Sequence, residues 1–121
     1  LERKDPLGAF AGTGHNLGAA VSRIVLETIF FKNAPLHDGA TIITGNTVSA
    51  AGAILPLSES SDLPSQFGLR HRAAAGISER TDAVAITVSE ETGNMHIFYN
   101  GTFEKLTANT LEKKIQEVLA G

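Results

Sequence analysis

The sequence contains no cysteine, which excludes disulfide bonds and thiolate metal sites. It also contains no apolar run near the roughly 18 residues that a membrane-spanning helix needs. Its first five residues lack the apolar stretch of a signal peptide. Nor is there an excess of positive charge: the net charge of −3 argues against a surface that coats nucleic acid. A small nucleotide remains possible, because it needs only a local cluster of positive charge.

The composition is that of a folded globular protein. The chain has 121 residues, of which 42% are hydrophobic and 19% charged. The length favours one domain over residues 1–121, and the composition argues against a disordered chain. The pattern of predicted strands and helices makes this domain α/β. Because the sequence opens on Leu1 rather than methionine, we expect it to be part of a longer chain.

The hydrophobic pattern predicts a mixed parallel and antiparallel sheet flanked by helices. Apolar residues at helical spacing predict a helix over residues 17–31, with Asn16 as its N-cap. The predicted strands cover residues 40–44, 47–54, 84–88 and 95–99. Gly45–Asn46 predicts a tight hairpin, and Asn100–Gly101 predicts another turn. A short helix is expected near residues 73–75, and a last helix over residues 109–119.

The first candidate site is the run from Pro35 to Ala40, just before a predicted strand. An aspartate followed by glycine at such a boundary is often only a turn. In the functional interpretation, His37 and Asp38 offer an imidazole and a carboxylate to a divalent metal ion. Gly39 would then remove a side chain where a ligand approaches the backbone.

The second candidate site is Arg70–His71–Arg72. In an extended backbone, both arginines would lie on one face and could reach one ligand. At the start of a helix, their charges would instead meet the positive end of the helix dipole, which is unfavourable without an anion. A polyphosphate would resolve that conflict. The alternative is a solvated basic stretch paired with Glu59 or Asp62.

The third candidate site is Ser89–Glu90–Glu91, at the end of a predicted strand. It could be a charged turn, or it could supply a carboxylate that binds a metal ion or orients a nucleophile. Sequence alone leaves both possibilities open.

Taken together and in order, these motifs resemble the diadenylate cyclase family. The resemblance covers about residues 17–106 and is closest to the membrane-tethered type. It rests on an ordered set of segments: Pro35 to Ala40, Leu55 to Ser60, Arg70 to Ala74, Gly76 to Glu79, Thr81–Asp82, Val88 to Gly93 and Asn100–Gly101.

The resemblance implies a function and a site. Two ATP molecules would be joined into cyclic di-AMP with release of pyrophosphate, across two sites that meet face to face in a homodimer. Asp38 would help activate the ribose 3′-hydroxyl, and a divalent cation (Mn²⁺, Mg²⁺ or Co²⁺) would be held by His37, Asp38 and Glu90. The resemblance also implies that Arg70, His71 and Arg72 grip the triphosphate and act with Asp38 in catalysis. The nucleotide-binding residues that it implies are Gly39, Ala40, Leu55, Leu69, Arg70, His71, Arg72, Ser89 and Glu90.

The resemblance also implies a location: a cytoplasmic domain anchored in a bacterial membrane by segments outside this sequence, with no nucleic-acid partner. The sequence departs from the family at Leu69, where threonine is common, and in the segment from Gly8 to Gly18. We therefore expect the opening helix and strand to be truncated. Two rival hypotheses remain, a catalytically silent sensor of ATP or cyclic di-AMP and a structural domain with an incidental basic stretch.

Overall fold

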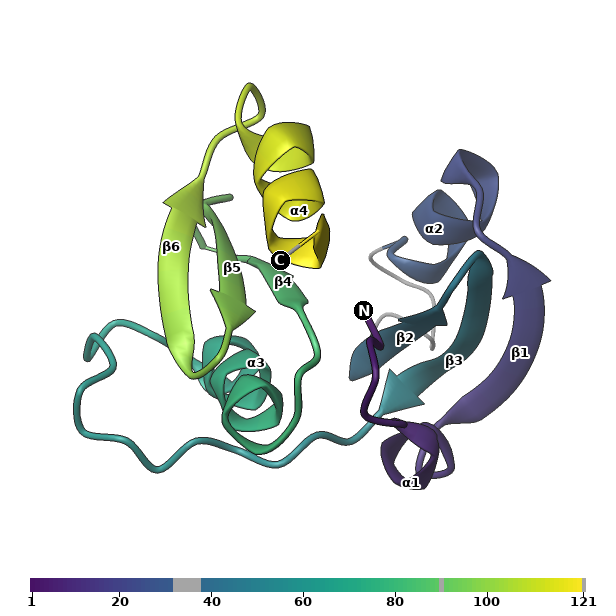
Figure 1. Cartoon of the computed structure of the whole chain (residues 1–121), viewed down its shortest axis with the longest axis horizontal. Helices are drawn as coiled ribbons and strands as arrows, with labels where there is room; N and C mark the ends of the chain where they lie inside the picture. The colour runs from purple at the N-terminus through teal and green to yellow at the C-terminus, as the bar shows by residue number, and fades with distance from the viewer. Residues whose placement is uncertain (32–37, 90, 121) are drawn as a thin grey trace. The chain divides into compact units, whose positions relative to one another are not determined.

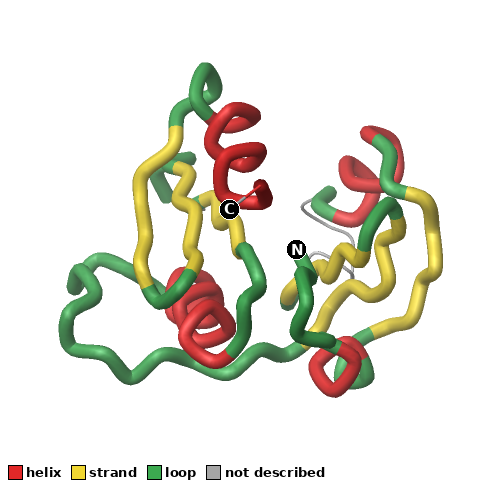
Figure 2. The backbone as a smooth tube through the Cα atoms, in the orientation of Figure 1, coloured by secondary structure: helices red, strands yellow, loops and turns green. Residues whose placement is uncertain are grey.

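The computed structural model describes residues 1–31, 38–89 and 91–120, and these divide into two compact units (Figure 1). Unit 1 is Leu1–Leu55 and unit 2 is Pro56–Gly121. Both units contain helices and strands, as Figure 2 shows by colour, so the α/β class is confirmed. No helix within the described ranges is long and apolar enough to cross a membrane.

Unit 1 is a three-stranded antiparallel sheet with two helices. Its elements in chain order are α1 (Gly8–Ala11), β1 (His15–Ala20), α2 (Arg23–Ile29), β2 (Ala40–Thr44) and β3 (Thr47–Ala53). The strand order is β1-β3-β2, and both outer strands run antiparallel to β3. The predicted hairpin at Gly45–Asn46 is confirmed, because these two residues join β2 to β3.

The core of unit 1 lies where α2 packs on the sheet. Ile29, Val48 and Ala51 are at most 2% exposed and form its centre. Half-buried Val25, Leu26 and Ile43 pack against them. Burial of these apolar groups is the main force that holds helix and sheet together.

The helix predicted over residues 17–31 is wrong in its first half. Residues 15–20 form β1, which pairs with β3 from His15 to Ala20. The helix α2 begins only at Arg23, and its N-cap is Ser22, whose Oγ accepts from the Val25 N–H at 3.1 Å, rather than Asn16. The apolar residues of this segment are spaced as in a helix, but hydrogen bonding of its backbone to β3 makes it a strand.

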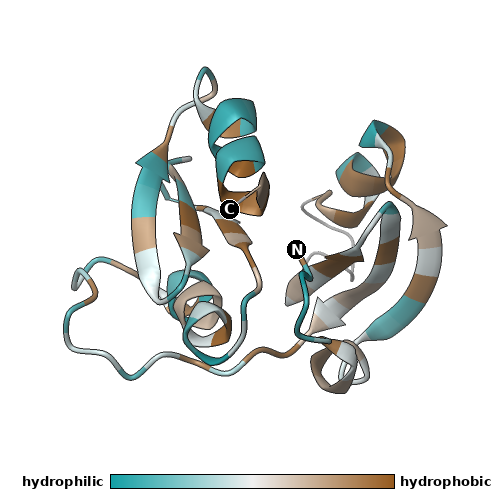
Figure 3. Ribbon diagram, in the orientation of Figure 1, coloured by the Kyte–Doolittle hydropathy of each residue, from teal (hydrophilic) through white to brown (hydrophobic). Residues whose placement is uncertain are grey.

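Unit 2 combines a three-stranded meander with two helices. Its elements are α3 (Leu69–Arg80), β4 (Ala85–Val88), β5 (Met95–Tyr99), β6 (Thr102–Leu106) and α4 (Leu111–Ala120). Phe67, Ala74, Ala75 and Phe98 form a buried core cluster. Figure 3 shows brown apolar segments on the strands and on α4, alternating with polar ones. The strand predicted over residues 95–99 is confirmed as β5 with the same bounds. β6 was not predicted, and the helix expected near residue 73 begins four residues earlier, at Leu69.

The predicted mixed sheet is also wrong. Each unit has its own antiparallel sheet, and no parallel pair occurs among the described strands. The short turns in β2–β3, β4–β5 and β5–β6 permit only antiparallel pairing. β1 and β2 do run in the same direction with α2 between them in sequence, but β3 separates them in the sheet. Residues 8–18, where we expected the opening helix and strand to be truncated, contain the four-residue helix α1 and most of β1.

Candidate functional site

Asp38 and Gly39 stand at the entry to β2, in unit 1. The Asp38 side chain is exposed. Gly39 has φ +101°, and a Cβ on it would lie 2.7 Å from the Gly52 carbonyl carbon and 2.9 Å from the Ala53 oxygen. The sequence predicted that a ligand approaches this glycine, but the structure places the backbone of β3 against it. Close packing against β3 therefore explains by itself why this position is glycine.

Two further predicted nucleotide contacts lie close by along the same hairpin. Ala40 is half-buried and pairs with Ala53 across the sheet. Leu55 is half-buried two residues beyond the end of β3. Their contact with a nucleoside stays a prediction.

The segment Arg70–His71–Arg72 forms the first turn of α3, so the helical alternative is the one observed. That turn contains no acidic residue, and its N-cap is Gly68, which has no side chain to accept a hydrogen bond from the helix. Successive helical side chains point about 100° apart, so the three residues diverge from one another.

Arg70 points toward the end of β4. Its Nη1 donates to the Val88 carbonyl oxygen at 2.7 Å, and its side chain is exposed. This bond brings the start of α3 next to Ser89. Leu69, immediately before it, is 73% exposed and marks the first residue of the helix.

Arg72 turns instead to the loop that precedes α3. Its Nη1 donates to the carbonyl oxygens of Ser58 at 3.3 Å and Ser60 at 3.4 Å. The Ser58 N–H donates in return to the Arg72 carbonyl oxygen at 2.9 Å. The sequence alternative paired this stretch with Glu59 or Asp62, but the observed partners of Arg72 are carbonyl groups of the same loop.

His71 is buried in the core of unit 2 and only 8% exposed. Its ring stacks on Phe67 with centroids 4.4 Å apart and meets His96 edge-on at 5.6 Å. Burial, reinforced by His96 and by Arg70, lowers the pKa of His71 below its ordinary value. Burial likewise lowers the pKa of His96, with Lys105 adding to the effect. Both rings are therefore neutral near pH 7.

Ser89 closes a turn after β4. Its N–H donates to the Asn94 carbonyl oxygen at 2.9 Å, and its carbonyl oxygen accepts from the Gly93 N–H at 2.9 Å. Its Oγ accepts from the Thr92 N–H at 3.4 Å. These bonds agree with the turn interpretation of the third candidate site. The predicted contact of Ser89 with phosphate stays a prediction.

Two of the three predicted metal ligands, His37 and Glu90, lie outside the described residues. Asp38 is described, and within the described ranges no group of three or more histidine, aspartate or glutamate side chains could hold a metal ion. Of the predicted donor set, the two carboxylates suit Mg²⁺ or Mn²⁺, and the imidazole adds a nitrogen donor that a transition metal such as Mn²⁺ or Co²⁺ accepts better than Mg²⁺ does.

The structure thus groups the predicted residues in two places. Arg70 and Ser89 are brought together in unit 2, and Asp38, Gly39 and Ala40 begin β2 in unit 1. Sequence reasoning missed residues that hold these motifs in place. The missed residues are Gly52, Phe67, Gly76 and His96. Only the two glycines had a signal in the sequence: Gly76 lies inside an alanine-rich helix and Gly52 inside a strand.

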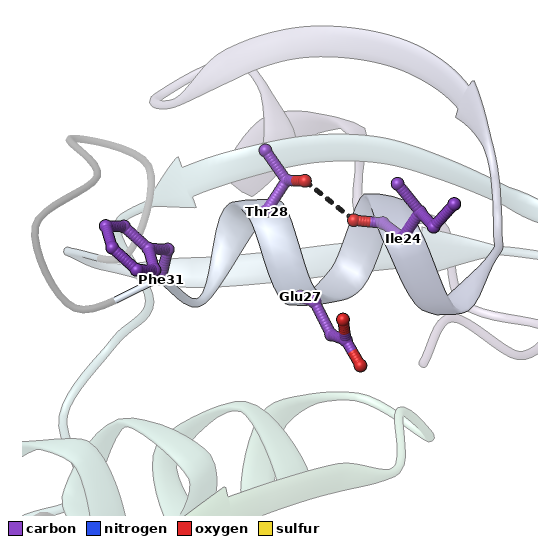
Figure 4. A pocket seen from close by; sticks show the side chains of 4 residues that line it. All are labelled: Ile24, Glu27, Thr28 and Phe31. Atoms are coloured by element: carbon purple, nitrogen blue, oxygen red, sulfur yellow. Dashed lines mark hydrogen bonds between the residues drawn. The ribbon is translucent and has the colours of Figure 1, made fainter.

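A hollow on α2 contains none of the predicted site residues (Figure 4). It is lined by Ile24, Glu27, Thr28 and Phe31, and its volume is about 350 Å³. The Thr28 hydroxyl donates within the helix to the Ile24 carbonyl oxygen at 2.7 Å. Ile24 and Phe31 supply the apolar surface of the hollow, and the exposed Glu27 carboxylate pairs with Arg23 at 2.6 Å.

These motifs and this fold define a known class of nucleotide-binding domain. Residues 1–103 match the family described as DisA bacterial checkpoint controller nucleotide-binding, and the chain belongs to this diadenylate cyclase domain family. The resemblance inferred from the sequence is confirmed.

Particular relatives extend the match over nearly the whole chain. The cyclic di-AMP synthase CdaA of Bacillus subtilis is 45% identical over 96% of this chain and 43% of its own length. A diadenylate cyclase of Listeria monocytogenes is 46% identical over 98% of this chain and 42% of its own. The chain therefore spans less than half the length of these curated relatives.

Solved structures agree in fold. DacA from Staphylococcus aureus, in a double-mutant crystal structure, superposes with a TM-score of 0.94 at 38% identity, covering 99% of this chain and 81% of that one. A protein from Bacillus cereus titled a hypothetical membrane spanning protein gives a TM-score of 0.84 at 42% identity, covering 88% of this chain and 52% of that one.

Proposed function

We propose that this domain condenses two ATP molecules into cyclic di-AMP and two pyrophosphates. Each ribose 3′-oxygen forms a bond to the α-phosphorus of the other ATP while the bond from that phosphorus to pyrophosphate breaks. The two hydroxyl protons leave to a base at each site. Two bonds form and two break, so the reaction balances without an oxidant or reductant.

One observation carries this proposal. Relatives named as cyclic di-AMP synthase or diadenylate cyclase match 96–98% of the chain at 45–46% identity. The chain retains the aspartate–glycine–alanine run at Asp38 and the arginine–histidine–arginine run at Arg70, and both stand at the start of regular elements.

The exposure and contacts of the motif side chains suggest a different role for each. Asp38 presents an exposed carboxylate, so it is the candidate group to accept the 3′-hydroxyl proton. Arg70 is the exposed arginine of its motif and supplies paired donors to phosphate oxygens. Arg72 and His71, tied to the loop and to the core, hold that motif in place. Catalysis rests on positioning and charge neutralisation, as phosphoryl transfer generally does.

A divalent cation fits the donor chemistry of the predicted ligands. Asp38, with His37 and Glu90, would hold it, and when bound it would neutralise phosphate charge and lower the pKa of the attacking hydroxyl. We also propose that two copies of the domain meet face to face with one ATP each. The product has two equivalent linkages, which a two-fold symmetric pair of sites produces naturally.

The cellular location of the domain is proposed from its relatives. We propose that the domain acts in the cytoplasm and is anchored in a bacterial membrane by segments outside this sequence. The support is the likeness to a protein titled as membrane spanning and the short coverage of the curated relatives.

A second candidate function is a sensor that binds ATP or cyclic di-AMP without turnover. Leu69 favours it, because an exposed apolar side chain stands directly before Arg70 where the family commonly has a threonine hydroxyl. Loss of one polar contact weakens a phosphate site but leaves its charge intact.

Incubation of the domain with ATP and Mn²⁺, with products separated by chromatography, distinguishes the two. We expect cyclic di-AMP from the unaltered protein and none from Asp38→Asn, which keeps the shape of the side chain but removes its charge. Matching circular dichroism spectra would show that both fold alike. Binding of ATP without any product would establish the sensor, and full activity of Asp38→Asn would refute the role given to Asp38.

A further inference from the structure

The end of β3 contains a bulge that faces the entry to β2. Ala40 pairs with Ala53, whereas Ile42 pairs with Ala50. Two steps along β2 thus match three along β3, so β3 has one extra residue in this stretch. Gly52 lies within it at φ +66°. Bulges of this kind bend a strand and redirect the side chains beside it.

Two different segments lie against the α-carbon of Gly52, and the Asp38 carbonyl is the tighter neighbour. A Cβ placed there would lie 3.3 Å from the Asp38 carbonyl oxygen and 3.4 Å from Cδ2 of His15. Gly39 approaches the same peptide from the β2 side, with a Cβ position 2.9 Å from the Gly52 α-carbon. The backbones at positions 38–39 and 52 are therefore in contact without any intervening side chain.

We propose that Gly52 is a positioning residue for Asp38: its bulge and its lack of a side chain set where the Asp38 carbonyl, and with it the carboxylate, stands at the entry to β2. This inference rests on the proposed function, in which Asp38 takes the proton of the 3′-hydroxyl. Gly52 itself touches no substrate in this account.

The geometry explains why a small change here reaches the chemistry. A methyl group at Gly52 leaves the Asp38 carbonyl oxygen a few tenths of an ångström too close, so the Asp38 carbonyl group has to move away. The carboxylate moves with its backbone. Displacements of about 1 Å at a reacting group cost up to roughly a hundredfold in rate, so a smaller shift is expected to cost about tenfold.

The hairpin offers a matched control. Gly45, in the turn at the other end of β2 and β3, has φ +60° and nothing within 4 Å of its Cβ position. Gly45→Ala therefore meets the same left-handed backbone cost as Gly52→Ala without pressing on any neighbour.

The test compares the two variants at saturating ATP and Mn²⁺. We expect a fall in kcat of about tenfold for Gly52→Ala and a change within about twofold for Gly45→Ala. Thermal unfolding checks that both variants are folded at the assay temperature, and Gly52→Ala should lose more of its thermal midpoint because it also presses on Asp38. Equal kcat values in the two variants would overturn the proposal.

A second comparison identifies which neighbour matters. Adding His15→Ala to Gly52→Ala removes the ring contact but leaves the Asp38 contact, so kcat should remain low. Recovery of kcat in the double variant would show that His15 transmits the effect and would overturn the proposal. If Gly52→Ala does not fold, Gly52→Asn and Gly45→Asn replace the pair, since asparagine tolerates positive φ.

A structural readout separates this inference from the proposed function. Amide resonances of Asp38 and Gly39 should shift in Gly52→Ala and stay in place in Gly45→Ala, whether or not the domain makes product. An inactive parent protein with this pattern would refute the cyclase and keep the positioning role. Unshifted Asp38 and Gly39 amides in Gly52→Ala would refute the positioning role.

Discussion

The buried Gly76 of α3 gives the sharpest stability prediction. A Cβ at this position would lie 1.8 Å from the Pro56 carbonyl oxygen and 3.0 Å from the Ser58 nitrogen. Ordinary contact starts at 3.4 Å, so the loop has to retreat by about 1.6 Å in Gly76→Ala. That movement would break the hydrogen bonds from Ser58 to the Arg72 carbonyl oxygen, at 2.9 Å, and to Glu79, at 2.7 Å.

The energy can be estimated from these losses. Two hydrogen bonds at about 1 kcal/mol each and an overpacking cost of about 1–2 kcal/mol give roughly 3 kcal/mol of destabilisation. Alanine returns up to about 1 kcal/mol through its higher helix propensity. We therefore expect Gly76→Ala to lower the free energy of unfolding by about 2 kcal/mol.

Urea denaturation followed by circular dichroism measures this difference. Gly8→Ala is the control, because Gly8 is also helical but has nothing within 4 Å of its Cβ position. It should leave stability unchanged or raise it by up to about 1 kcal/mol. A loss below about 0.5 kcal/mol in Gly76→Ala would refute the account of how the loop docks on α3.

Three further predictions concern the arginine–histidine–arginine motif and its surroundings. Arg70→Ala should raise the KM for ATP about tenfold or more while changing the free energy of unfolding by less than about 1 kcal/mol, because its bond to Val88 is exposed. Arg72→Ala should instead lower that free energy by about 1–3 kcal/mol, since it removes two bonds to the preceding loop; equal stability of the two variants in urea would contradict this division. His71 and His96 have lower pKa values in the folded state than in the unfolded chain. As the pH drops below about 6.5, the two histidines are therefore protonated in the unfolded chain before they are protonated in the folded one, and the free energy of unfolding should fall. In His96→Phe this slope should become shallower in urea titrations between about pH 7 and 5, and an unchanged slope would exclude His96 as a source.

Local signals in the sequence account for the elements that were predicted well. Gly45–Asn46 predicted the β2–β3 hairpin, and in the structure Gly45 supplies the positive φ of the turn, at +60°. The stripe of Leu111, Ile115 and Val118 located α4 within two residues of its observed bounds. Asn100–Gly101 marked a turn correctly, yet β6 was missed because its exposed Glu104 and Lys105 hide the strand pattern.

The elements that failed depend on distant partners. β1 is mostly exposed and has no alternation, so only its pairing with β3 identifies it as a strand. The candidate site shows the same limit. Its motif residues were found by their order in the sequence, but the contacts of Gly52 with Asp38 and of His96 with His71 join positions far apart in the chain.

Whether the domain is a cyclase that works in pairs is tested by the rate of cyclic di-AMP formation per protomer, measured over a wide range of protein concentration with ATP and Mn²⁺ saturating. We expect two pyrophosphates per cyclic di-AMP and a rate per protomer that rises with concentration as pairs of domains form. A domain that binds ATP but makes no product at any concentration would contradict the cyclase. A rate per protomer that stays constant down to the lowest concentration at which product is measurable would contradict transient face-to-face pairing.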